Sequence, residues 1–128
     1  MQARGASKTI ISEMSVKRQQ FTRQLGARHV MDPRQFDMAA AIQRLCGGAG
    51  PDIVFYCAGV PHSIEAVCRA VRARGSIVNV TIWEKKVPFH PNWLAFRETK
   101  YLAVLGFNDK DYKGVVEALK GGNEVVGW

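Results

Sequence analysis

The chain alternates between short apolar runs and longer stretches in which apolar residues recur with helical spacing. The short runs are rich in β-branched residues, which predicts strands. Five strands are expected, at residues 8–12, 29–31, 52–57, 76–82 and 101–107. Several runs are apolar at consecutive positions, as in Ile-Val-Phe-Tyr at 53–56. Such runs favour parallel strands that are covered by helices on both faces.

Four helices are predicted, each with a polar residue at its start and a glycine beyond its end. They are expected to start at Ser15, Asp37, Ser63 and Asp109, and the first three to stop at Gly26, Gly47 and Gly75. Phe21 and Leu25 are expected to pack inward on the first helix. The alternation of strands and helices indicates an α/β fold, a single domain with a parallel sheet and right-handed crossovers.

Composition is that of a folded protein in water, with 47% apolar and 23% charged residues. No run approaches the length of about 18 apolar residues that a membrane helix needs. The formal net charge of +7 invites a nucleic-acid interpretation, but the basic residues are scattered and no RNA-recognition or zinc-finger pattern accompanies them. A solvated surface is the first interpretation of this charge, attraction of an anionic cofactor the second, and nucleic acid the third.

The cysteines and histidines show no metal-binding pattern. Cys46, Cys57 and Cys68 lie far apart, with no C-x-x-C and no histidine at ligand spacing. They are expected to be reduced, buried thiols in a cytoplasmic protein. His62 and His90 each lack a second ligand or a catalytic partner nearby in the sequence, and both are expected at the surface.

The first predicted strand is followed by an acid, Glu13, and then by a serine-capped helix. In dinucleotide-binding folds an acid at this place accepts hydrogen bonds from the adenosine ribose, about 20 residues after the glycine-rich turn that holds the pyrophosphate. Only residues 1–12 precede Glu13, and they contain no such turn. Taken alone, Glu13 is better interpreted as a surface acid at the end of a strand.

A second stretch of interest is GAGPDIVFYCAGVPHS, at 48–63. Its small residues Ala58 and Gly59 stand at the carboxyl end of a strand, where they would let a flat ligand approach the backbone. A tight turn that needs glycine for its dihedral angles is an alternative, and the two interpretations are compatible. Cys57 has no visible base nearby, so a buried thiol is preferred to a nucleophile.

Together these stretches resemble the cofactor domain of zinc-type medium-chain alcohol and polyol dehydrogenases, and most of all their butanediol and sorbitol dehydrogenase branch. The resemblance covers nearly the whole chain and is carried, in the family's order and spacing, by GASKTIISEMSVKR (5–18), LGARHVMDP (25–33), GGAGPDIVFYCAG (47–59), RARGSIVNVTIWEK (72–85) and LAVLGF (102–107). It implies a partial Rossmann-like, doubly wound parallel sheet that lacks its first strand and its glycine-rich loop.

The resemblance also implies cofactor-binding residues. Glu13 would bind the adenosine ribose diol and favour NAD over NADP through its charge, and Arg18 would lie beside the adenosine. The remaining residues would line the adenosine end (Cys57, Ala58, Gly59 and Val60), the nicotinamide side (Val80, Thr81 and Ile82) and the carboxamide (Leu105 and Gly106). No residue matches a zinc ligand or a proton relay of the family, so we predict neither catalytic residues nor metal ligands.

The reaction implied by the resemblance is hydride transfer between a secondary alcohol or diol and NAD, with zinc polarising the oxygen. We predict that this chain alone does not catalyse it, and that it binds NAD weakly or not at all, because the N–H donors of the pyrophosphate loop are not found among these residues. Residues 101–107 would pair with a second subunit, either in a homodimer or with a full-length dehydrogenase. The alternative function is therefore that of a non-catalytic, truncated paralogue acting as an interaction module.

In the order implied by the resemblance, the strands at 8–12 and 52–57 would share a central strand that is not found among these residues. Each buried backbone group left without a partner costs about 1–3 kcal/mol, against a typical total stability of about 5–15 kcal/mol. Three outcomes are expected: the two strands pair directly, a partner chain fills the gap, or the chain folds poorly.

Overall fold

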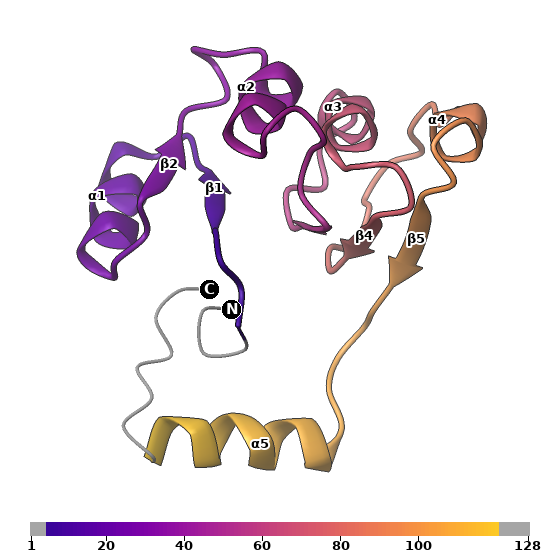
Figure 1. Ribbon diagram of the computed structural model, residues 1–128. Coiled ribbons are helices and arrows are strands. Elements are labelled where there is room, and N and C mark those ends of the chain that lie inside the picture. Colours follow the sequence, from indigo (N-terminus) through magenta and orange to yellow (C-terminus); the bar gives the residue numbers. More distant parts are fainter. Residues whose placement is uncertain (1–4, 121–128) are drawn as a thin grey trace. The chain divides into compact units, whose positions relative to one another are not determined.

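The computed structural model describes residues 5–120, in which strands and helices alternate along the chain (Figure 1). The elements are β1 (Ile10–Ser12), α1 (Val16–Gln24), β2 (His29–Met31), α2 (Met38–Leu45), β3 (Ile53–Tyr56), α3 (Ser63–Ala70), β4 (Ser76–Asn79), α4 (Asn92–Ala95), β5 (Lys100–Ala103) and α5 (Asp109–Lys120). Two compact units are present among the described residues, 5–36 with 106–120, and 37–105. The predicted α/β fold with parallel sheets is confirmed.

The first unit contains a two-stranded parallel sheet, in which Ile11 of β1 is opposite Val30 of β2. The connecting helix α1 is capped by Ser15, as predicted. Phe21, however, does not pack inward, since it is 60% exposed. The buried residue of α1 is Gln19, whose side-chain amide donates a hydrogen bond of 2.7 Å to the carbonyl of Glu13. A polar contact to the backbone therefore fixes the helix where an apolar stripe was expected.

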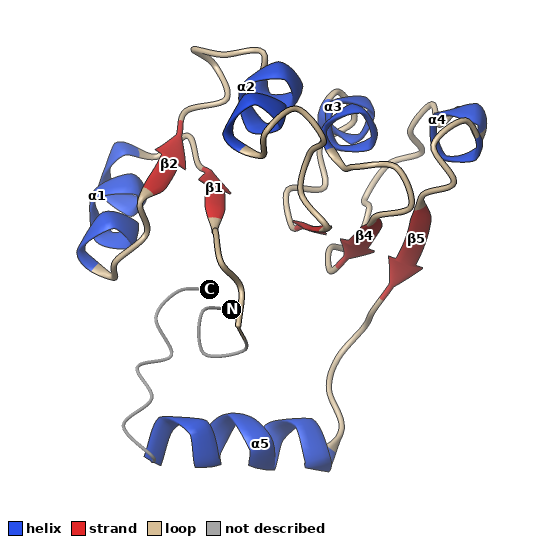
Figure 2. Ribbon diagram, viewed as in Figure 1, coloured by secondary structure: helices blue, strands red, loops and turns tan. Residues whose placement is uncertain are grey.

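The second unit is built on the parallel sheet β3-β4-β5, with β4 in the centre (Figure 2). One face of this sheet packs against α3 and α4. Its core consists of Tyr56, Ile64, Cys68, Val71 and Ile77, with Val54, Val67, Trp83, Trp93 and Leu94 packed around it. Side chains alternate along a strand, so Ile53, Phe55 and Leu102 point to the other face, where they are 46–52% exposed.

Element ends deviate from the sequence-based prediction in three ways. Helix α3 ends at Ala70, before the predicted stop at Gly75, because Val71 already has an extended backbone with φ −61° and ψ 143°. The strands predicted at 76–82 and 101–107 are shorter, because the residues after Asn79 and Ala103 leave the sheet. The last helix is capped by Asn108 and not by Asp109: the Asn108 side-chain oxygen accepts a 2.9 Å hydrogen bond from the backbone N–H of Asp111. The short helix α4 was not predicted, since a single turn leaves no periodic pattern.

Both sheets have an edge without a strand partner among the described residues. β1 and β2 pair only with each other, and β3 and β5 each pair only with β4. Direct pairing of β1 with β3, one of the three outcomes expected from the sequence, is therefore not found in residues 5–120. Unpaired strand edges present free N–H and C=O groups to which another extended segment can bind.

We expect Gly50→Ala to destabilise the protein strongly. Gly50 has a φ of +96°, and an added Cβ would meet the carbonyl of Ala70 and would lie 2.9 Å from the backbone nitrogen of Arg72. The variant combines the strain of a left-handed residue, which costs about 1–2 kcal/mol, with overpacking, which costs about 1–3 kcal/mol. Thermal unfolding followed by circular dichroism measures the effect.

Gly48→Ala is the matched control for this substitution. Gly48 has a similar φ of +92°, but an added Cβ there would meet no atom within 4 Å. The control carries the dihedral strain without the steric conflict, so its melting temperature should fall less. Equal losses in the two variants would show that the backbone around Gly50 is not packed as described.

Candidate functional site

Glu13 stands at the carboxyl end of β1, where its backbone N–H donates a 3.0 Å hydrogen bond to the carbonyl of Met31. Its carboxylate is held by two residues that follow it. Oε1 accepts hydrogen bonds from the backbone N–H of Ser15 (2.7 Å) and from Nη2 of Arg18 (2.9 Å), and Oε2 accepts one from Nε of Arg18 (2.7 Å). Glu13 and Arg18 thus form a bidentate ion pair between a half-buried carboxylate and an exposed guanidinium.

These contacts lower the pKa of Glu13 to about 2. The hydrogen bonds from Arg18 are the largest cause, followed by the backbone N–H of Ser15. An ionised carboxylate offers about four acceptor positions, and three are in use here. A ribose diol that takes two of them must therefore displace or share part of the Arg18 contact. The structure brings these two predicted residues into direct contact, while their roles in cofactor binding stay a prediction.

A second carboxylate lies at the same edge of this small sheet and was missed by the sequence analysis. Asp32 follows β2, is only 6% exposed, and pairs with Nη2 of Arg34 at 2.6 Å. The same nitrogen of Arg34 donates to the carbonyl of Met14 at 3.0 Å. Asp32 and Arg34 therefore join the loops that follow β1 and β2, and the only sequence signal for them is their Asp-Pro-Arg order.

The turn after β3 holds the predicted residues Cys57, Ala58, Gly59 and Val60. Cys57 was expected to be buried, but it is exposed at the end of the strand. Desolvation of its sulfur nevertheless raises the pKa of the thiol, so the thiol is protonated at neutral pH and is a poor nucleophile. Cys46 is half-buried, and only Cys68 fits the expected buried thiol.

Gly59 is the point at which this turn approaches the loop after β4. Its φ is +63°, and a Cβ added to it would lie 2.8 Å from Oγ1 of Thr81 and 3.6 Å from the carbonyl oxygen of Ile82. Both requirements, the left-handed backbone and the close approach, exclude a side chain here. Two predicted segments, 57–60 and 80–82, are therefore neighbours at the carboxyl edge of the sheet, where open α/β sheets bind ligands.

The loop after β4 is held by Asn79, another residue that the sequence analysis did not single out. Its side chain is buried, with 7% exposure, and Nδ2 donates a 2.9 Å hydrogen bond to the carbonyl of Thr81. Oδ1 of Asn79 is buried without a partner in the described residues. A polar residue inside the apolar run Ile-Val-Asn-Val was the available signal. Val80 and Ile82 flank Thr81 and are 42% and 74% exposed.

The last two predicted residues follow β5. Leu105 is 84% exposed, and Gly106 has a φ of +73° with open space around its Cα. Exposed backbone of this kind can offer hydrogen bonds to a ligand, but no contact within residues 5–120 assigns such a role. Their part in cofactor binding therefore stays a prediction.

Among residues 5–120, no three His, Cys, Asp or Glu side chains gather in a way that could hold a metal ion. A protein zinc site needs three or four such ligands in tetrahedral geometry. The residues that the structure describes therefore do not fit a zinc site, and no chemical step is derived through zinc. His62 and His90 are exposed, as predicted.

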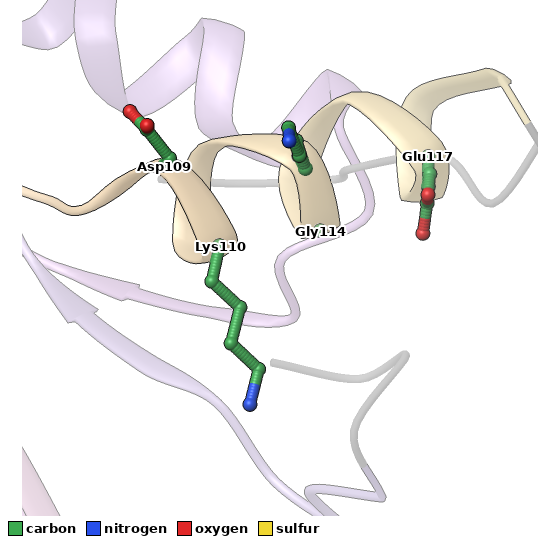
Figure 3. Close-up of a pocket in the computed structure, with 5 residues that line it drawn as sticks. Asp109, Lys110, Gly114 and Glu117 are labelled. Carbon is green, nitrogen blue, oxygen red and sulfur yellow. The ribbon is translucent and has the colours of Figure 1, made fainter.

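A shallow hollow is present on α5, lined by Asp109, Lys110, Lys113, Gly114 and Glu117 (Figure 3). All five residues belong to one helix, and the side chains are charged with mixed sign. Small-molecule sites are usually concave, mostly apolar and built from several elements. This hollow includes none of the predicted residues and is not a candidate for the site.

Comparison with known proteins gives a consistent family. The family model described as zinc-binding dehydrogenase matches residues 1–121. The curated (R,R)-butanediol dehydrogenase of Bacillus subtilis is 33% identical over 109 residues, which cover 85% of this chain and 31% of the relative. The chain thus spans about a third of the length of that relative.

Solved structures agree with this result. The crystal structure of 2R,3R-butanediol dehydrogenase from Bacillus subtilis matches with a TM-score of 0.86 and 32% identity, covering 94% of this chain and 34% of that one. A zinc-binding dehydrogenase from Sinorhizobium meliloti, whose crystal structure has NADP bound, matches with a TM-score of 0.83 and 25% identity. That match covers 94% of this chain and 36% of the other.

We expect Arg18→Met to raise the pKa of Glu13 from about 2 toward the ordinary value of 4.5. Because the folded-state pKa lies below the ordinary value, ionised Glu13 contributes stability above about pH 4.5. This contribution is lost as the pH falls toward 2. Titration of the Glu13 carboxyl carbon by NMR measures the pKa in both proteins.

Lys17→Met is the control, since it removes the same charge from the neighbouring, exposed position of the same helix. It should leave the Glu13 midpoint nearly unchanged. A Glu13 titration midpoint near pH 4.5 in the parent protein, or equal shifts in both variants, would contradict the bidentate ion pair.

Proposed function

The chain belongs to the zinc-binding dehydrogenase family, and we propose that it forms part of the NAD-binding domain of an alcohol or polyol dehydrogenase. The parent reaction in this proposal is hydride transfer between a secondary alcohol or diol and NAD. The observation that carries the proposal is the ionised Glu13 carboxylate at the carboxyl end of a parallel strand. A second observation supports the proposal: Gly59 closely approaches Thr81 at the carboxyl edge of the other parallel sheet.

In the proposed complex each segment has a physical task. Glu13 accepts hydrogen bonds from the ribose hydroxyls, and Arg18 gives up part of its contact with Glu13 to lie beside the adenosine. Residues 57–60 allow the backbone to come close to the nucleotide, because Gly59 has no side chain. Asn79 orients the Thr81 carbonyl at the nicotinamide side. NAD, once bound, supplies the carbon that accepts the hydride.

NAD is proposed over NADP, because a carboxylate repels a 2′-phosphate. Arg18 lies within hydrogen-bonding distance of Glu13 and could in principle attract that phosphate, since arginine forks bind phosphates well. In this structure, however, the guanidinium is engaged by Glu13. Both nucleotides are therefore included in the test.

We place the protein in the cytoplasm. Its three cysteines are free thiols, which is typical of a reducing compartment. Within residues 5–120, no helix has the length and apolar character that a bilayer crossing requires.

A second candidate function is that of an interaction module that pairs with a full-length dehydrogenase or with a second copy of itself. It is favoured by β5, all of whose residues are exposed, and by the apolar residues around it. Leu102, Val104 and Leu105 are 50%, 49% and 84% exposed. An exposed apolar edge strand is a ready template for pairing with another chain.

We expect the chain to bind NAD, or its ADP-ribose part, only weakly, because residues 1–12 contain no glycine-rich pyrophosphate loop. Glu13→Gln should weaken this binding further, by about tenfold or more. The reason is that hydrogen bonds to a charged group contribute about 1.5–3 kcal/mol, and each 1.4 kcal/mol changes affinity tenfold. NADP should bind less well than NAD to the parent protein. Isothermal titration calorimetry gives the dissociation constants.

Asp52→Asn is the matched control. Asp52 also pairs with an arginine, Arg72, at 2.6 Å, but it precedes β3 at the amino end of the strand, away from the carboxyl edge. The control should bind NAD like the parent protein. Equal loss in both variants, or no affinity in the parent protein, would contradict the proposal.

A second experiment tests whether the chain alone is catalytically inactive. We expect the chain with NAD and butanediol, with or without zinc, to show no change in nicotinamide absorbance, because the residues 5–120 do not fit a zinc site. Measurable turnover would overturn the prediction.

The two candidate functions are separated by partner binding. Co-purification with a full-length dehydrogenase subunit, together with no affinity for NAD, would favour the interaction module.

A further inference from the structure

Tyr56, the last residue of β3, contacts both loops at the carboxyl edge of the β3-β4-β5 sheet. It is 3% exposed and belongs to the core of the second unit. Its ring stacks on Trp83, with centroids 5.3 Å apart and an angle of 22° between the planes. Trp83 follows the segment 80–82, so the ring of Tyr56 packs against the loop that leaves β4.

The hydroxyl of Tyr56 reaches the other loop. It accepts a 3.0 Å hydrogen bond from the backbone N–H of Val60, and it lies 3.0 Å from the carbonyl oxygen of Val60 and 2.7 Å from Oγ of Ser63. Oγ of Ser63 lies 2.9 Å from the same carbonyl oxygen. The two hydroxyls and the peptide groups of Val60 thus form a closed ring of hydrogen bonds, in which every group has a partner.

These contacts matter because the clearance between the loops is small. A Cβ on Gly59 would already come within 2.8 Å of Oγ1 of Thr81, so the backbone of Gly59 lies as close to the Thr81 side chain as a glycine permits. The hydrogen bonds that the described residues make to the turn converge on Val60, one residue beyond Gly59. Loss of the anchor at Val60 would let Gly59 move relative to Thr81.

We propose that Tyr56 is a positioning residue, which fixes the turn at 57–60 through its hydroxyl and the loop at 80–82 through its ring. The inference rests on the proposed function in one respect, namely that these two loops line the nucleotide site. Tyr56 itself is buried and does not touch the ligand in this proposal. It acts by holding the turn at Gly59 against Thr81, so that both loops keep their positions beside the proposed nucleotide site.

The simpler alternative is that Tyr56 is only a large core residue. The two roles are separable, because the ring and the hydroxyl make different contacts. Tyr56→Phe keeps the ring and its stacking on Trp83 but removes the anchor of Val60. Ile64→Val is the control, since it removes one methyl group from the same core and leaves the hydrogen-bonded ring intact.

Two measurements test the proposal on the complete chain. In Tyr56→Phe, hydrogen exchange at the Val60 amide should become at least tenfold faster, and the affinity for NAD should fall severalfold. In Ser63→Ala the effects should be smaller, because the tyrosine hydroxyl can still accept from Val60 N–H and donate to its carbonyl. Ile64→Val should lower the melting temperature. It should not speed exchange at the Val60 amide more than at other core amides, and it should leave the affinity for NAD unchanged.

The outcomes distinguish the proposals from each other. Unchanged exchange at Val60 in Tyr56→Phe, or the same loss of affinity in Ile64→Val, would overturn the positioning role. A parent protein that binds no NAD would contradict the proposed function, and the exchange measurement would then decide alone whether Tyr56 fixes the turn. The emission of Trp83 should stay unchanged in Tyr56→Phe, which shows that the ring contact survives.

Discussion

Parallel pairing of β3, β4 and β5 is the constraint on which the second unit depends. Because the strands run in the same direction, their carboxyl ends lie along one edge of the sheet, and the loops after β3 and β4 become neighbours there. Residues distant in the sequence, such as Gly59 and Thr81, come into contact at this edge. The buried Tyr56 and Asn79, which face each other across the β3-β4 pair, then tie each loop to the sheet.

β1 and β2 also pair in parallel, so the charged residues that follow these two strands lie at one edge of their sheet. Two carboxylates, Glu13 and Asp32, follow the two strands, and each is held by an arginine that comes shortly after it in the chain. Local sequence therefore supplies both members of each pair, while the sheet decides where the pairs lie. Ionised acids at a strand's carboxyl end suit hydroxyl groups better than phosphates, which is the basis on which Glu13 is proposed to bind a ribose.

The sequence predicted most of the secondary structure because the signals are local. Ser15 and Asp37 cap helices as expected, since a cap depends only on the next three residues. The errors arose where neighbours distant in sequence decide. Phe21 is exposed and Cys57 lies at the surface, because burial depends on which element covers a face. The hydroxyl of Tyr56 could not be predicted as an anchor, since its partners depend on the course of the turn after β3.

The bidentate ion pair between Glu13 and Arg18 has a consequence for how the proposed site would respond to pH. Its carboxylate stays charged down to strongly acidic conditions, and the guanidinium of Arg18 does not lose its proton at any physiological pH. The charge of the proposed ribose-binding group is therefore constant over the physiological pH range. Any acidity-driven change in how tightly a nucleotide is held must then come from the ligand or from groups other than this pair.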